Sequence, residues 1–164
     1  MTPFDLVITR RGARFMGRYF PCSLGRSGIS AAKHEGDGAT PLGNHRIVGC
    51  LYRPDRIVAP NNWAEPIYPR DLWSDDISDP NYNTVVKAPH PYSHEKLRRA
   101  DPLYDLILLT DWNYPNAIPV MGSAIFLHRW RKPGHPTEGC VAFHPNHLNW
   151  IAGRIVPGIR MIVG

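Results

Sequence analysis

The amino-acid sequence predicts a single, mainly β domain with long irregular loops and one or two short helices. The chain has 164 residues, which suits one domain with a core of its own. Its 17 prolines and 14 glycines favour turns and argue against a bundle of long helices. Short apolar runs rich in β-branched and aromatic residues recur along the chain, as is typical of strands. We see no repeat and no second domain, so residues 1–164 are assigned to one domain.

Several short runs are expected to form strands. They are Leu6–Thr9, 14–20, 45–52, 103–110, 123–128 and Arg160–Val163. The first two are expected to form an opening hairpin that turns at Arg11 and Gly12. The run at 103–110 is apolar enough to be a central strand.

The segments between these runs are predicted to be loops and short helices. Residues 35–41 contain two glycines, two acids and a proline, which indicates a tight turn, and they lack the Gly-Lys-Ser/Thr ending of a phosphate loop. Residues 53–102 are expected to be mostly irregular, but they are too aromatic for a disordered linker, so we expect a packed excursion beside a cleft. Helices are expected at 93–99, capped by Ser93, and at 145–151, which has a proline in its first turn.

Charge and cysteine content limit the partners. The formal net charge of +5 favours a polyanion, either nucleic acid or a carboxylate-rich polymer, and charge alone does not separate them. Three widely spaced cysteines do not resemble a disulfide framework, although a bridge between Cys22 and Cys50 stays open. No apolar run approaches the length of a membrane span, and no signal peptide is visible.

The stretch 123–143 carries the strongest indication of chemistry. An apolar run ends on His128, a loop rich in Gly, Pro and Arg follows, and Gly139 then precedes Cys140. A thiol is mostly protonated at neutral pH because its free pKa is about 8.5, but a nearby imidazole can take the proton and leave an ion pair. Gly139 would let a substrate approach, and amides around the nucleophile can stabilise an oxyanion. The second ring nitrogen of His128 needs a partner, for which we expect a backbone carbonyl.

Other interpretations of these residues were considered. Cys140 could be a buried structural thiol, and a single histidine is more often a core residue than a base. His135, Cys140, His144 and His147 have spacings that could bind zinc, but prolines interrupt the run and no second cysteine is near. We therefore expect no metal and no cofactor.

Two segments resemble a known family. Residues 122–128 (Gly-Ser-Ala-Ile-Phe-Leu-His) and 136–142 (Pro-Thr-Glu-Gly-Cys-Val-Ala) resemble the L,D-transpeptidase catalytic domain, the YkuD-like fold, in the branch whose motif runs Thr-Glu-Gly-Cys. Further segments resemble that branch in the same order; they are 24–28, Lys33, 35–41, 52–55, 73–76, 82–83 and 103–105. The resemblance therefore covers nearly the whole chain.

The resemblance implies a β-sandwich domain with the cysteine in a cleft, and acyl transfer on peptidoglycan stem peptides. Cys140 would attack a carbonyl next to an L-centre, normally that of diaminopimelate, and expel D-alanine. The thioester would then pass to an amine on a neighbouring stem. His128 matches the family's base, and Gly139 and Cys140 match its oxyanion-hole backbone. Carbapenems, which acylate many members, are candidate inhibitors.

The sequence departs from the commonest family pattern at two positions. Glu138 stands where a histidine is usual, and Ala142 stands where an arginine is usual. The carboxylate-binding role of that arginine is expected to fall on Arg129 or Arg131. Thr137 and Glu138 are further expected substrate contacts. Two more expected contacts lie earlier in the chain, namely Tyr82, which lines a groove or packs, and Asp76, which with Asp75 binds the acceptor amine or caps a loop.

Three functions remain open from the sequence. The first is a peptidoglycan L,D-transpeptidase that crosslinks stem peptides. The second is an L,D-carboxypeptidase or endopeptidase of the same fold, in which water replaces the amine. The third, more remote, is a non-catalytic module that binds cell wall or nucleic acid. For the enzyme we expect a monomer whose partner is peptidoglycan rather than nucleic acid. That function would place the protein in the periplasm or cell envelope, and a cytoplasmic location or another export route stays open, because no signal peptide is visible.

Overall fold

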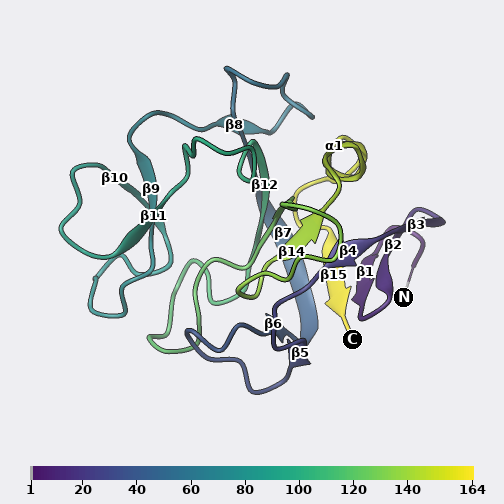
Figure 1. Ribbon diagram of the computed structural model, residues 1–164, viewed down its shortest axis with the longest axis horizontal. Coiled ribbons are helices and arrows are strands. Elements are labelled where there is room, and N and C mark those ends of the chain that lie inside the picture. Colours follow the sequence, from purple (N-terminus) through teal and green to yellow (C-terminus); the bar gives the residue numbers. More distant parts are fainter. Residues whose placement is uncertain (1) are drawn as a thin grey trace.

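A computed structural model describes residues 2–164 (Figure 1). The strands are β1 (Leu6–Thr9), β2 (Gly12–Phe15), β3 (Arg18–Phe20), β4 (Cys22–Ser23), β5 (Ile29–Ser30), β6 (Thr40–Pro41), β7 (Gly43–Tyr52), β8 (Glu65–Pro66), β9 (Asp71–Ser74), β10 (Val85–Lys87), β11 (His94–Lys96), β12 (Leu106–Thr110), β13 (Phe126–Arg129), β14 (Val141–Phe143) and β15 (Arg160–Val163), and the helix is α1 (Pro145–Ala152). The mainly β fold class predicted from the sequence is confirmed.

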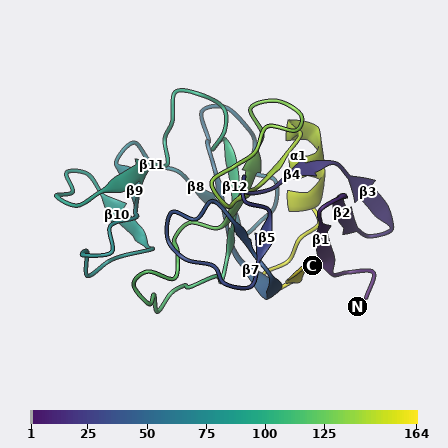
Figure 2. The same cartoon turned by 60° about the horizontal axis from the view of Figure 1, so that its bottom comes forward.

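One large sheet organises the molecule. Its strands follow the order β3-β2-β1-β15-β7-β12-β13-β14-β4, and β8 adds to β7. Strand β12 is buried along its whole length between β7 and β13, as expected for an apolar run at the centre of a sheet. Strands β1 and β15 pair in parallel, so the two ends of the chain meet in the sheet, and both termini lie beside β1 in Figures 1 and 2.

A second, smaller sheet stands apart from the first. It has the order β10-β9-β11, and Figure 2 shows it on the side of the molecule opposite the β1–β3 hairpins. Trp73 of β9 packs edge-to-face on Phe126 of β13, with ring centroids 4.9 Å apart, and both rings are buried. This contact belongs to one of two apolar cores. The other lies between the main sheet and α1, whose Leu148, Ile151 and Ala152 are buried.

Several local predictions are confirmed and others are wrong. The helix at 145–151 and the strand at 45–52 are present as α1 and β7. The expected strand at 14–20 is instead two strands, β2 and β3, because the chain turns back at Met16 and Gly17, both with positive φ. The helix expected at 93–99 is wrong, since His94–Lys96 forms β11, and the excursion at 53–102 contains the whole second sheet.

Two observations concern cysteines and membranes. Cys22, Cys50 and Cys140 are all free thiols, so the bridge between Cys22 and Cys50 that the sequence left open is not formed. Within residues 2–164, no helix has the length and apolar character needed to cross a membrane.

Candidate active site

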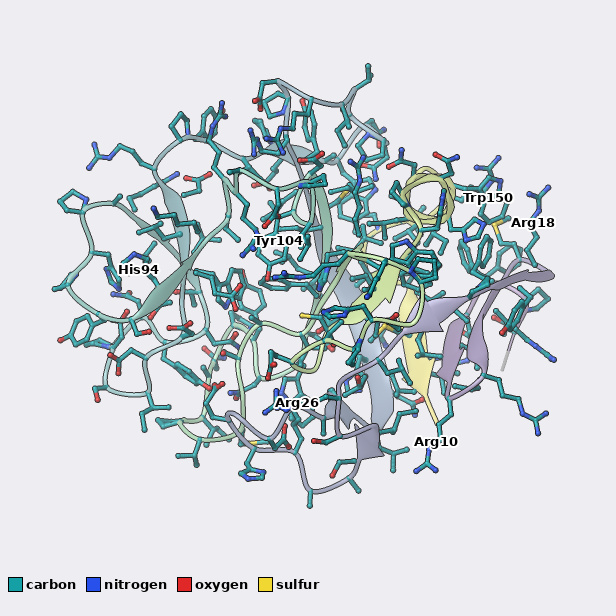
Figure 3. The ribbon with its side chains drawn as sticks, viewed as in Figure 1. Arg10, Arg18, Arg26, His94, Tyr104 and Trp150 are labelled. Carbon is teal, nitrogen blue, oxygen red and sulfur yellow. The ribbon has the colours of Figure 1, made fainter. Side chains whose placement is uncertain are left out.

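Cys140 and His128 line the same cleft, which has a volume of about 610 Å³ and lies between the two sheets. The pairing of β13 with β14 brings them together. These strands run parallel, and His128 is in register with Ala142, two residues after Cys140. Cys140 ends the loop that enters β14, so its thiol lies beside the strand that carries the imidazole. Tyr104, labelled in Figure 3, lies in the same region, between the second sheet and the central strands.

The environment of the His128 ring fixes its tautomer. Its Nδ1 lies 2.7 Å from the backbone oxygen of Arg129, and because a carbonyl only accepts, Nδ1 must carry the proton. This confirms the expectation that a backbone carbonyl holds the second ring nitrogen. Tyr104 packs edge-to-face on the ring, with centroids 5.4 Å apart, which restricts its rotation. Nε2 is therefore left with a lone pair, as a general base requires.

The thiol of Cys140 is held as a neutral donor. Its Sγ donates to the carbonyl of Ala124 at 3.0 Å and accepts from the N–H of Phe126 at 3.4 Å. Burial raises the pKa of Cys140 to about 12, and burial also lowers the pKa of His128 to about 4. Both shifts favour the uncharged forms. In the resting state they favour a neutral thiol and a neutral imidazole over the ion pair that the sequence suggested.

The turn before the nucleophile needs a glycine. Gly139 has φ +139°, and a Cβ added there would lie 2.8 Å from the backbone oxygen of Ala39. The turn is also braced by hydroxyls. Thr137 Oγ1 donates to Cys140 O at 2.6 Å and accepts from Gly139 N at 3.1 Å, while buried Thr40 donates to Gly139 O at 2.9 Å. The Gly139 N–H is therefore occupied, whereas the Cys140 N–H makes no hydrogen bond to any described residue and is available to an oxyanion.

The expected substrate contacts divide into two groups. Arg131, Thr137 and Glu138 line the cleft, where Glu138 forms an ion pair with Arg26. Arg129 does not line it, because the guanidinium turns to Asp105, with Nη1 2.7 Å from Oδ2.

Tyr82 and Asp76 also lie outside the lining of the cleft. The Tyr82 hydroxyl donates to Glu35 Oε2 at 2.5 Å, and Glu35 itself lines the cleft. Asp76 accepts from the backbone N–H groups of Ser78 at 2.9 Å and Ser93 at 3.3 Å. It thus has the loop-capping arrangement that the sequence left open as an alternative to amine binding.

Glu95, Arg99 and Tyr104 are among the residues of the cleft to which the sequence assigned no role. Glu95 and Arg99 lie in the segment 93–99, which was predicted to be a short helix and was therefore not assigned to the site. Tyr104 is part of the segment 103–105, which resembles the family and could have indicated it.

Comparisons with known proteins identify the family of the chain. The profile of the L,D-transpeptidase catalytic domain, YkuD, matches residues 5–163. Among solved structures, an L,D-transpeptidase from Mycobacterium smegmatis is similar, with a TM-score of 0.46 and 14% sequence identity over 97% of this chain and 57% of that one. The chain thus spans little more than half of that protein. No curated protein matches. Because the profile covers almost every residue, the chain belongs to the L,D-transpeptidase catalytic domain family, YkuD.

Proposed function

We propose that this protein is a peptidoglycan L,D-transpeptidase that works through a thioester on Cys140. The observation that carries the proposal is the placement of Cys140 and a tautomer-fixed His128 in one cleft of a YkuD domain. Such a pair provides a nucleophile and a base on the same cleft. The substrate would be the stem peptide of peptidoglycan, an anionic polymer that suits the net charge of +5, and the site of action would be the cell envelope.

Acylation would begin from neutral groups. A donor peptide entering the cleft displaces the thiol from Ala124 O, Nε2 of His128 takes the thiol proton, and the sulfur attacks the donor carbonyl. The Cys140 N–H then donates to the oxyanion. His128 returns its proton to the departing amine of D-alanine, and the thioester remains on Cys140.

Arg131 is the cation best placed to hold a donor carboxylate. It lines the cleft, whereas Arg129 is committed to Asp105. A guanidinium binds a carboxylate in two hydrogen bonds, which orients the donor as well as attracting it. Arg131 would in this way take the role that arginine has at the position of Ala142 in the commonest family pattern.

Incubation with purified muropeptides, followed by mass spectrometry, tests the proposal. Crosslinked dimers are expected, together with a thioester adduct on wild-type protein that is absent from Cys140→Ala. Shortened monomers without dimers would instead indicate the carboxypeptidase or endopeptidase. Retention of muropeptides without any product would indicate a binding module. A carbapenem is a second acyl donor for the same adduct experiment.

A further inference from the structure

Three carboxylates line the cleft without a cationic partner. They are Glu35, Asp75 and Glu95, and among residues 2–164 no ion pair joins any of them to a lysine or arginine. Arg99 lines the same cleft, but its guanidinium binds Asp101. All three are partly buried, and carboxylates gathered in one cleft repel one another unless a cation or a proton joins them. An unneutralised acidic wall in a protein of net charge +5 therefore favours a cationic ligand.

Two of these carboxylates are held in place by buried tyrosines. The hydroxyl of Tyr82 donates to Glu35 Oε2 at 2.5 Å, and that of Tyr104 donates to Glu95 Oε2 at 2.6 Å. Each phenol fixes one carboxylate oxygen and leaves the other for a ligand. Asp75 adds a third oxygen, because its Oδ1 is buried and has no hydrogen-bond partner in the described chain. Preorganised, unsatisfied acceptors of this kind suit an ammonium group, which has three donors.

The acidic wall adjoins the reacting groups. Tyr104, which holds Glu95, also packs on the ring of His128, a residue that is only 6% exposed and whose Nε2 bonds to no described residue. The negative charge of Glu95 contributes to the raised pKa of Cys140, after the larger effect of burial. Burial raises the pKa of Glu95 as well, and the charges of Asp75 and Glu35 add to that rise. A carboxylate that binds protons more readily than usual, on the same cleft as the nucleophile, is suited to act as a base.

We propose that Glu35, Asp75 and Glu95 bind the primary ammonium group of the acyl acceptor and that Glu95 takes its proton. This inference rests on the proposed function. The ammonium gives one proton to Glu95, and the neutral amine attacks the thioester carbonyl. The C–N bond forms, the C–S bond breaks, and the thiolate leaves with its electron pair. The amide nitrogen gives its second proton to the thiolate through His128 Nε2, and Glu95 releases its proton to water. Glu95 thereby favours transfer to an amine over transfer to water.

Glu95→Gln is the variant that tests this role. Glutamine keeps an oxygen for the Tyr104 hydroxyl but takes no proton from an ammonium. Glu65→Gln, on an exposed residue of β8 outside the cleft, is the matched control. Cys140 of each protein is first acylated with a tetrapeptide donor, and a primary amine is then added. Intact mass measures thioester formation, and product analysis measures the ratio of aminolysis to hydrolysis.

The proposal expects thioester formation by Glu95→Gln to be no slower than in wild type. The ratio of aminolysis to hydrolysis should fall by roughly 10²-fold, the size of a general-base contribution, and the control should match wild type. Hydroxylamine, which reacts as a neutral molecule, should release the thioester from both proteins at equal rates. Asp75→Asn should raise the KM for the amine with a smaller effect on kcat.

Two outcomes would overturn the proposal without touching the proposed function. One is an unchanged aminolysis ratio in Glu95→Gln. The other is an equal loss with the amine and with hydroxylamine, which would mean that Glu95 only supports the shape of the site. Failure of wild-type protein to form any thioester would be different, because it would remove the transpeptidase function itself.

Discussion

Burial is the largest cause of the shifted pKa values of both His128 and Cys140. Because burial holds the pKa of His128 near 4 instead of 6.5, the imidazole is an unprotonated base throughout the range between those values. We predict that the rate of thioester formation falls only as pH approaches about 4. A pH profile of acylation, followed by mass spectrometry, measures this directly.

Alkylation of the thiol gives the complementary measurement. With the pKa of Cys140 raised to about 12, reaction with a small neutral alkylating reagent should keep accelerating with pH and show no plateau near the ordinary thiol value. A plateau at neutral pH would show that the resting site is an ion pair after all, and an acid limb of acylation near 6.5 would show that burial does not lower the pKa of His128.

Gly139 is the residue whose backbone conformation determines the shape of the turn before the nucleophile. Alanine there would need a positive φ of 139° and a Cβ 2.8 Å from Ala39 O. We predict that Gly139→Ala loses about 1–3 kcal/mol of unfolding free energy through strain, and most of its acylation rate. Gly134→Ala is the control, since Gly134 also has a positive φ but its Cβ would meet nothing within 4 Å. Urea denaturation compares the two, and equal losses would argue against the close contact.

At the level of elements, hydrogen bonds connect the turn that contains Gly139 and Cys140 to the N-terminal half of the chain. Thr40, at the start of β6, is fully buried, accepts from Gly25 N at 3.0 Å and donates to Gly139 O at 2.9 Å. Thr40→Val has almost the same shape but leaves both backbone groups unpaired. We predict a loss of about 1–3 kcal/mol for each buried group left unsatisfied, seen as a lower urea midpoint. Thr84→Val, which removes an exposed hydrogen bond, should cost much less.

The elements predicted correctly are those whose pattern is local. Helix α1 follows from a proline in its first turn and an apolar face, and β7 and β12 follow from β-branched and apolar runs. Strand β11 was missed because three residues are too few to show the alternation of apolar and polar side chains that is typical of a strand. Its conformation depends instead on pairing with β9, which lies about 20 residues earlier in the chain. Sequence patterns cannot express such pairing.

The site was predictable in part for the same reason. His128, Gly139 and Cys140 lie within one short stretch of the sequence, and their residue types by themselves indicate a nucleophile, a base and a tight turn. The neutral state of the pair was not predictable, because burial is a property of the assembled molecule. Glu95 and Tyr104 approach the site through tertiary packing, and Arg129 is withdrawn from it by Asp105.

For the whole molecule, one ion pair joins the two ends of the chain. Arg160 of β15 binds Asp5, just before β1, in two hydrogen bonds of 2.9 and 2.7 Å, and these strands lie side by side in the large sheet. The bonds to Arg160 hold the pKa of Asp5 well below its ordinary value of 3.8. A lowered carboxyl pKa in the folded state stabilises the protein above the unfolded pKa, and the benefit is lost as pH falls through the folded pKa.

We therefore predict that Asp5→Asn lowers the unfolding free energy at neutral pH and that the gap to wild type narrows as pH falls below 3.8. Urea denaturation at a series of pH values measures the gap. Asp76→Asn is a control of another kind, since the pKa of Asp76 is also lowered, but by backbone N–H groups of its own loop rather than by a cation. Raising the salt concentration should shrink the gap for Asp5→Asn more than for Asp76→Asn, because a partly exposed ion pair is screened. A gap for Asp5→Asn that stays constant at every pH would mean that the carboxylate charge does not hold β1 to β15.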